Sequence, residues 1–152
     1  MKLTTILSIA LAGFTTARPA VLQAQTAQTI TDDLIWSVSD FVIGCSQGGC
    51  VFRYDIVGNE NAMTPKFSTH CDGIVGQASL CEDNNITTTV SPAGWTTDSE
   101  AQWEVGVVHT WKSLLSDKSL ATWYQHGVKN ATVPDRNPVH FVMKPTKEYG
   151  IA

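Results

Sequence analysis

The stretch Cys50-Val51-Phe52-Arg53-Tyr54-Asp55-Ile56-Val57 alternates between residues suited to a core and residues suited to solvent. Its even positions hold a cysteine, two aromatic residues and an isoleucine, whereas its odd positions include Arg53 and Asp55. Side chains of a β-strand point to opposite faces in turn, so a period of two is typical of a half-buried strand. We therefore take a strand at residues 50–57 as the starting point for the fold.

The same period recurs along the chain on both sides of this stretch. Residues 34–43 are also β-like, but their apolar parity switches between Val38 and Phe41, which predicts a bulge near Ser39 or Asp40. The shorter alternating runs lie at residues 67–71, 86–90, 103–111 and 139–143.

Turn-forming residues separate these runs. Glycine, proline, asparagine and aspartate cluster at residues 48–49, 57–59, 91–94 and 134–138. A helical turn fits only residues 112–120, where several serines and an aspartate weaken it. Short strands with frequent turns predict an all-β fold, a compact antiparallel β-barrel or β-sandwich in a single domain.

The N-terminus has the pattern of a secretion signal. Lys2 precedes an apolar run from Leu3 to Phe14, which is too short to span a membrane. Small residues then place cleavage after Ala17, so residues 1–17 are predicted to be a signal peptide. We expect residues 18–31 to form a flexible arm, residues 32–152 to form the domain, and the protein to be extracellular.

The charge balance argues against several classes of partner. The chain has 14 acidic and 10 basic residues, for a formal net charge of −4, and no cluster of lysine and arginine. Nucleic-acid binders and proteins that attach to anionic membranes depend on such clusters. We therefore expect neither a nucleic acid nor a membrane among the partners.

Four cysteines at Cys45, Cys50, Cys71 and Cys81 form two short local pairs. An even number of cysteines in an exported chain indicates disulfide bonds. Proximity favours Cys45–Cys50 and Cys71–Cys81, yet loop entropy slightly favours longer connections, so all three connectivities remain open. With every cysteine paired, no thiolate nucleophile is available.

No residue pattern indicates catalysis or a cofactor. The acidic pairs 32–33 and 82–83 fall in loops or at strand edges, and no nucleophile elbow, zinc-binding helix or phosphate loop is present. The histidines at 70, 109, 126 and 140 lie on different segments, so a metal site is not expected. His109, beside Trp111, fits a hydrogen-bonded core histidine. We expect a protein that is not an enzyme and that holds no cofactor or metal.

Five tryptophans raise the question of aromatic binding surfaces. Trp36, Trp103 and Trp111 lie within predicted strands and fit the core. Trp95 follows a turn and Trp123 lies on a mixed strand, so these two are the candidates for surface contacts.

Two sequons offer sites for N-linked glycans. They are Asn85-Ile86-Thr87 and Asn130-Ala131-Thr132, and both lie near predicted strand ends. Asn85 and Asn130 are therefore candidate glycosylation sites.

The cysteine frame and aromatic spacing resemble small secreted fungal proteins related to the major allergen of Alternaria, and most closely their elicitor-like subgroup. The segments that carry the resemblance are residues 35–41, 50–56, 67–73, Cys81 and the ending 141–152. The resemblance implies an antiparallel β-barrel or sandwich, two intramolecular disulfides with Cys71–Cys81 as the family's central one, and no catalytic residues. The allergen's later cysteine pair and its dimer-linking cysteine are missing here, so we expect no disulfide-linked dimer; a non-covalent homodimer stays open.

Together these features predict a secreted, non-enzymatic fungal protein. Its expected role is that of an effector, elicitor or allergen-like protein that recognises a host plant protein or a cell-wall component through its surface. The alternative is a secreted module that binds a small ligand or a carbohydrate through Trp95, Trp123 or the interior of the fold.

Overall fold

The computed structural model describes residues 25–27, 33–96, 100–134 and 138–152. All regular structure in these ranges is β-strand, which confirms the predicted all-β class. The strands are β1 (Gln25–Ala27), β2 (Trp36–Ser46), β3 (Gly49–Gly58), β4 (Phe67–Ile74), β5 (Ala78–Leu80), β6 (Ile86–Trp95), β7 (Ala101–Leu114), β8 (Leu120–Thr132), β9 (Val139–Met143) and β10 (Pro145–Ile151).

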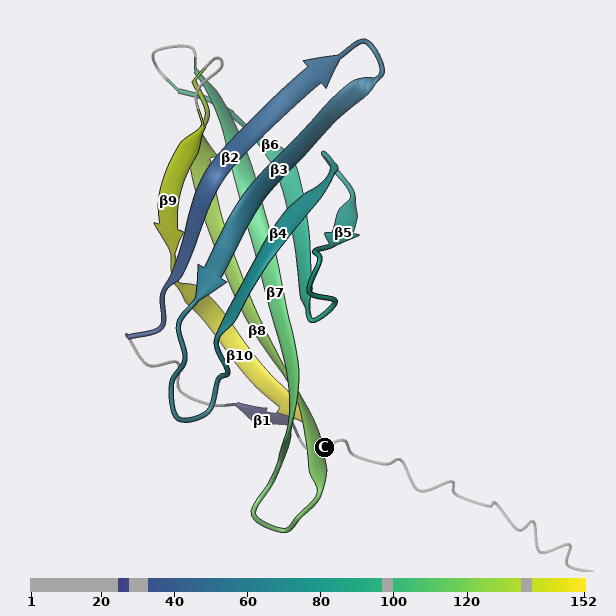
Figure 1. The fold of residues 1–152 in the computed structure, drawn as a ribbon, viewed down its shortest axis with the longest axis vertical. Coiled ribbons are helices and arrows are strands. Elements are labelled where there is room, and N and C mark those ends of the chain that lie inside the picture. Colours follow the sequence, from purple (N-terminus) through teal and green to yellow (C-terminus); the bar gives the residue numbers. More distant parts are fainter. Residues whose placement is uncertain (1–24, 28–32, 97–99, 135–137) are drawn as a thin grey trace, which may run out of the picture.

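The strands form two antiparallel sheets that lie one over the other (Figure 1). One sheet has six strands in the order β1-β10-β8-β7-β6-β5, and the other has four in the order β4-β3-β2-β9. The chain passes from the second sheet to the first at Lys144, the one residue between β9 and β10. Of the two predicted architectures, the sandwich is the one that fits.

The alternating pattern of residues 50–57 sets which side of β3 faces inward. Phe52, Tyr54 and Ile56 are at most 3% exposed and lie in the main core, together with residues from both sheets. Trp36 packs edge-on against Phe67 and lies over Gly127, where an added Cβ would sit 2.7 Å from its ring. The apolar face of each sheet is thus buried against the other, which is the main stabilising contribution in such a fold.

The predicted bulge lies in β2. Its pairing with β3 shifts register between Ser39 and Val42, and Asp40 there has a φ of 54°. The extra residue returns Phe41 to the core side, where it is fully buried.

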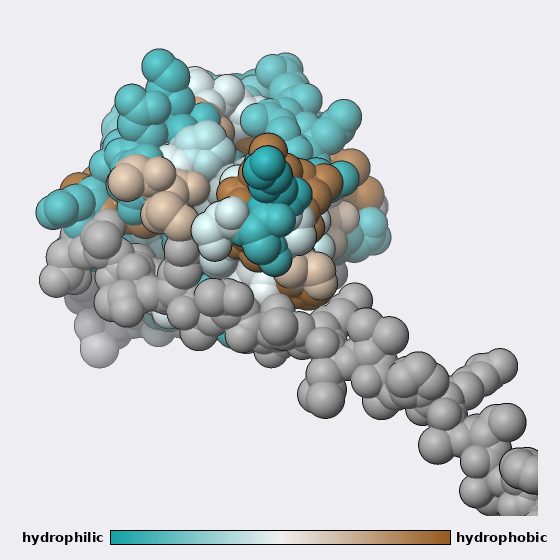
Figure 2. All heavy atoms as spheres, turned by 90° about the horizontal axis from the view of Figure 1, so that it is seen from below, coloured by the Kyte–Doolittle hydropathy of each residue, from teal (hydrophilic) through white to brown (hydrophobic). Residues whose placement is uncertain are grey.

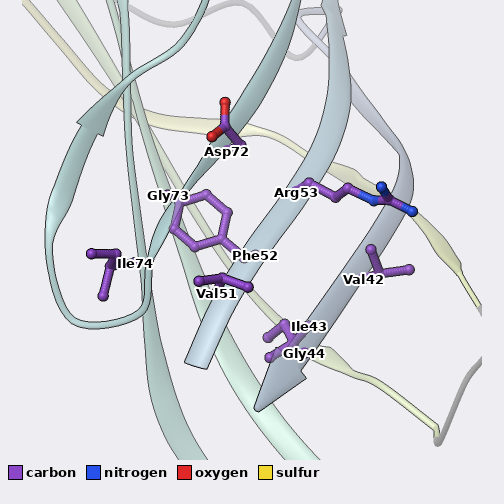
Figure 3. A pocket seen from close by; sticks show the side chains of 9 residues that line it. All are labelled: Val42, Ile43, Gly44, Val51, Phe52, Arg53, Asp72, Gly73 and Ile74. Carbon is purple, nitrogen blue, oxygen red and sulfur yellow. The ribbon is translucent and has the colours of Figure 1, made fainter. Parts of the chain in front are cut away.

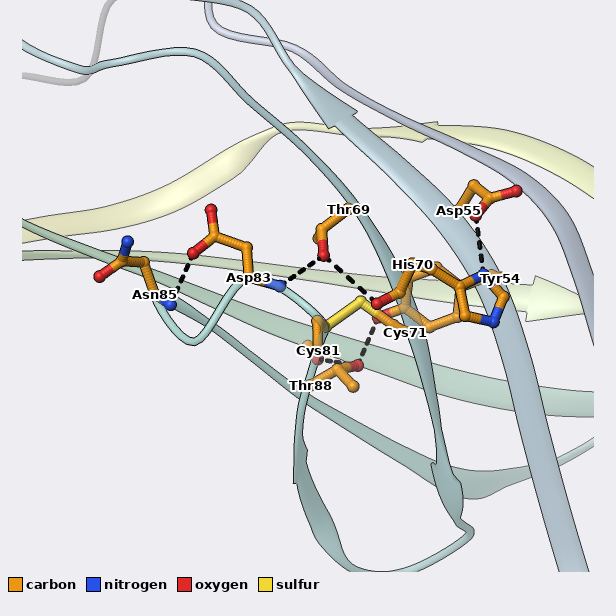
Figure 4. Close-up of a disulfide and its surroundings, with 10 residues drawn as sticks. Tyr54, Asp55, Thr69, His70, Cys71, Cys81, Asp83, Asn85 and Thr88 are labelled. Atoms are coloured by element: carbon orange, nitrogen blue, oxygen red, sulfur yellow. Dashed lines mark hydrogen bonds and ion pairs between the residues drawn. A yellow bond between two sulfur atoms is a disulfide. The ribbon is translucent and has the colours of Figure 1, made fainter.

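Both local cysteine pairs form disulfides. Cys45 and Cys50 are directly opposite each other in the β2–β3 hairpin. Cys71 on β4 is bonded to Cys81, which follows β5, so this bond joins an edge of one sheet to an edge of the other (Figure 4). The second disulfide therefore closes one side of the sandwich.

Some segments differ from the predictions. Residues 112–120 form no helical turn, because β7 and β8 run into a hairpin closed by a Leu115 N–H to Ser119 hydrogen bond. Leu114 and Leu120 are opposite each other near its tip and are 70% and 57% exposed. Figure 2 shows this end of the molecule, where hydrophobic and hydrophilic residues lie side by side.

Strands β5 and β10 were not predicted, and β4 continues three residues beyond Cys71.

The predicted signal peptide at residues 1–17 lies outside the described residues. Of the predicted arm, only residues 25–27 are described, and they pair with β10 as the short edge strand β1. Part of the arm thus belongs to the sheet. Among the residues that the structure describes, no helix is long and apolar enough to cross a membrane.

Candidate functional site

The outer side of strands β2, β3 and β4 carries an unusual mixture of exposed apolar and charged side chains. Cross-strand register sets their order, since partners in adjacent strands place their side chains next to each other. Val51 pairs with Ile74, Arg53 with Asp72, and Asp55 with His70. We call this surface the β2–β4 face; its residues are Val42, Val51, Arg53, Asp55, His70, Asp72 and Ile74.

A hollow of about 620 Å³ lies on this face (Figure 3). Val51 and Ile74 line it and are 56% and 50% exposed. Gly44, which also lines it, has open space where a Cβ would be, so the missing side chain helps to form the hollow. Figure 3 shows Arg53 extending across β2 towards Val42. Most of its lining residues are apolar, and its charged ones are Arg53 and Asp72, so we call it the apolar hollow.

A second hollow of about 480 Å³ adjoins the first, because Val42 and Arg53 line both. Asp40, Asp55 and His70 also line this second hollow. The His70 ring Nδ1 lies 2.8 Å from Asp55 Oδ1, a contact that is an ion pair when the imidazole is protonated (Figure 4). This second hollow holds two carboxylates besides Arg53 and His70, and we call it the acidic hollow.

The bulge residue Asp40 sits at this second hollow in a strained conformation. Positive φ is uncommon for residues other than glycine, although aspartate tolerates it better than most. The backbone N–H of Asp40 donates to Nδ1 of His140, 3.3 Å away. The positive φ belongs to the bulge that returns Phe41 to the core, and the same bulge places Asp40 at the hollow.

The β2–β4 face is suited to recognition by shape and charge. Three carboxylates, those of Asp40, Asp55 and Asp72, lie around Arg53, which forms no ion pair among the described residues. The His70 ring hydrogen-bonds to Asp55, and the described part of the chain has no free cysteine. Both hollows are within the size range of ligand pockets.

The two candidate tryptophans differ sharply in the structure. Trp95 lies at the end of β6 and is 73% exposed, so its ring is available for contacts. Trp123 is 2% exposed and stacks against Trp111 in a second buried cluster, separate from the main core. Its indole N–H donates to Ser113 Oγ. The expectation that Trp123 is a surface contact is therefore wrong, because its position on β8 faces inward.

Both sequon asparagines are exposed. Asn85 lies in the turn before β6, and Asn130 lies in β8 opposite Glu104. Neither position is sterically closed to a glycan.

Polar side chains also form a row inside the sandwich. His109 on β7, Gln125 on β8 and Glu148 on β10 are neighbours in register and are at most 7% exposed. Gln125 Nε2 donates to Glu148 Oε2 at 2.6 Å. Burial lowers the pKa of His109 to about 4, against a smaller opposing effect of Asp83. Burial raises the pKa of Glu148, and the hydrogen bond from Gln125 opposes that shift.

His109 is thus a core histidine, as predicted, but its Nδ1 has no hydrogen-bond partner among the described residues. No group of three or more histidine, cysteine or acidic side chains in the described ranges is arranged to hold a metal ion.

Sequence reasoning did not find the β2–β4 face. Its charged residues occupy the odd positions of the 50–57 pattern, so their outward direction was readable. Their partners on β4 could not be predicted from the sequence, because register between strands depends on the turn at residues 59–66.

The fold and its surface define a small disulfide-bonded β-sandwich protein with two adjoining hollows on one outer face. No protein-family model, curated protein or solved structure matches the chain. The resemblance to the Alternaria allergen family therefore stays a prediction.

Proposed function

We propose that this is a secreted fungal recognition protein of the effector or elicitor kind, which binds a host protein or a cell-wall component through the β2–β4 face. The observation that carries the proposal is that an apolar hollow and an acidic hollow meet at Arg53 and Val42 on an exposed sheet face. Interfaces often combine an apolar centre with a polar rim, and arginine is enriched in them. The predicted secretion signal, the two disulfides and the family resemblance support an extracellular location.

The proposal is tested by infiltrating purified protein into leaves of several plants and measuring ion leakage and reactive oxygen. The double variant Val51→Glu/Ile74→Glu places charges in the apolar hollow and should lower the response at least about tenfold, the effect of losing one well-packed contact. Val142→Glu is the matched control, since Val142 is 51% exposed on β9 and lines neither hollow. It should leave the response unchanged.

A second variant fills the apolar hollow without adding charge. Gly44→Leu places a side chain in open space at a position with ordinary backbone geometry, so the fold should tolerate it. The response should again fall. A wild-type protein that elicits no response in any host, or a double variant as active as wild type, would overturn the proposal.

A secreted module that binds carbohydrate is the second candidate, favoured by the 73% exposure of Trp95. Exposed aromatic rings stack on the apolar faces of sugars. Soluble cell-wall glycans should then quench tryptophan fluorescence, and Trp95→Ala should abolish the quenching. Equal quenching in Trp95→Ala and wild type would exclude this role for Trp95.

A further inference from the structure

Polar atoms without hydrogen-bond partners gather in the interior of the protein. Nearly all buried polar groups in folded proteins are hydrogen-bonded, so a group of exceptions calls for an explanation. Each of the side chains concerned is at most 8% exposed. Among the described residues, the inward-facing atoms that lack a partner are Trp36 Nε1, Thr64 Oγ1, His109 Nδ1, Trp111 Nε1 and Gln125 Oε1.

Four of these five side chains form one continuous group with Phe67. The ring of Phe67 lies 5.6 Å from that of Trp36 and 4.6 Å from that of His109, measured between centroids. The His109 ring in turn lies 4.9 Å from Trp111, and Gln125 is its register partner on β8. The unpartnered atoms are therefore set among aromatic faces.

Phe67 also faces a hollow on the outside of the molecule. This hollow of about 730 Å³ lies beside the start of β4 and is lined by Phe67, Gly58 and Asp83, among others. The Phe67 ring packs directly on Gly58, where an added Cβ would lie 2.2 Å from it. The Phe67 ring, which lines the hollow, also lies 4.6 Å from the His109 ring between centroids, so the hollow is next to the polar group. The side chain of Phe67 is thus the wall between the hollow and His109.

The chemistry of the unpartnered atoms restricts what could bind them. The two indole N–H groups can only donate, Gln125 Oε1 can only accept, and His109 Nδ1 can do either. A hydroxyl group can accept from an indole and donate to the glutamine at once. A charged ligand is disfavoured, because transfer of a charge into an apolar interior is costly. Aromatic faces suit an apolar body.

We propose that the interior between Phe67, His109 and Gln125, entered from the hollow beside Gly58, binds a small neutral molecule with a hydroxyl group on an apolar body. The ring of Phe67 moves aside to admit it, and the hydroxyl group accepts a hydrogen bond from an indole N–H and donates one to Gln125 Oε1. This site shares no residue with the β2–β4 face.

The test is a titration of ¹⁵N-labelled protein with cyclohexanol and with methylcyclohexane, which has nearly the same shape but a methyl group in place of the hydroxyl. The indole N–H signals of Trp36 and Trp111 should move, while that of the exposed Trp95 should not. Cyclohexanol should bind at least about tenfold more tightly, since it satisfies buried polar groups. A purely apolar cavity would instead favour methylcyclohexane.

His109→Phe keeps an aromatic ring but removes Nδ1, so it should abolish the preference for cyclohexanol. Val51→Glu/Ile74→Glu should leave cyclohexanol binding unchanged, which separates this site from the proposed recognition face. If His109→Phe does not fold, the wild-type titration still decides. Indole signals that stay in place, signals that all move together with that of Trp95, or tighter binding of methylcyclohexane would each overturn the proposal.

Discussion

Tyr54 on β3 and Thr88 on β6 share a hydrogen bond in the interior that joins the two sheets (Figure 4). Both side chains are at most 1% exposed. Thr88 Oγ1 also lies 3.1 Å from the carbonyl oxygen of Gly106, to which it donates, so the phenol hydroxyl is the donor to Thr88. Burial raises the pKa of Tyr54, so the phenol keeps its proton throughout the physiological range.

Removing the two partners should have unequal effects. Tyr54→Phe leaves Thr88 still bonded to Gly106 and should cost about 1 kcal/mol of unfolding free energy. Thr88→Val leaves the buried Tyr54 hydroxyl without a hydrogen-bond acceptor and should lower the free energy of unfolding by about 1–3 kcal/mol. Urea denaturation of both variants and of the double variant tests this. A double variant no more stable than Thr88→Val would contradict the explanation.

His109 should make stability depend on pH. Its pKa is lowered from 6.5 to about 4 in the folded protein, so the unfolded chain binds a proton at higher pH than the folded one. Stability should therefore fall as pH drops from 6.5 to 4, by up to roughly 3 kcal/mol. Urea denaturation midpoints measured between pH 6.5 and 4 report this fall in stability. His109→Phe should make the midpoint depend less on pH. An unchanged slope in that variant would show that other groups cause it.

Glu148 should make stability depend on pH in the same sense as any group with a raised pKa: it favours the folded state at low pH, whereas His109 favours it at high pH. Its pKa is raised above 4.5 in the folded state, so the folded protein holds its proton to higher pH than the unfolded chain. This contribution is complete below pH 4.5 and is lost as pH rises through the folded pKa. Glu148→Gln should thus be more stable than wild type at pH 7, with the difference shrinking towards pH 4.5. A glutamine variant that is less stable at pH 7 would mean that the carboxylate is stabilised there.

The all-β class and the inward face of β3 could be read from the sequence because alternation reports directly on which side is buried. The bulge at Asp40 was readable for the same reason, since an extra residue reverses the parity of the pattern. Trp123 shows the limit of this reasoning. Its neighbours Thr122 and Tyr124 are half-buried on the outer face, so the contrast across β8 is weak in sequence.

The β2–β4 face and the interior polar row both depend on register. His109, Gln125 and Glu148 come from three strands, and only the pairing of β7, β8 and β10 brings them together. A single sequence carries no direct record of such pairing. The local disulfides were easier, because few residues separate their cysteines.

Asp40 offers a test that separates backbone strain from carboxylate chemistry. Asp40→Gly and Asp40→Ala both remove the carboxylate, but only glycine adopts a φ of 54° without steric cost. The alanine variant should be about 1 kcal/mol less stable than the glycine variant. Thermal unfolding measures the difference. If the acidic hollow serves recognition, both variants should lose elicitor activity equally, whereas unequal loss would trace the effect to the backbone.

The two disulfides should differ in what they contribute to stability. Cys71–Cys81 spans ten residues, has both sulfurs in the core and ties the two sheets together, whereas Cys45–Cys50 spans five and lies in an exposed hairpin. Chain entropy alone gives nearly 3 kcal/mol for the longer loop and about 2 for the shorter. Cys71→Ser/Cys81→Ser should exceed its entropic value, within the usual 2–5 kcal/mol, because the buried site also loses packing. Cys45→Ser/Cys50→Ser should stay near 2 kcal/mol. Urea denaturation and thiol titration of both variants check the ranking. Four free thiols in the native protein would refute both bonds, and equal losses would show that the inter-sheet position of Cys71–Cys81 adds nothing beyond its loop length.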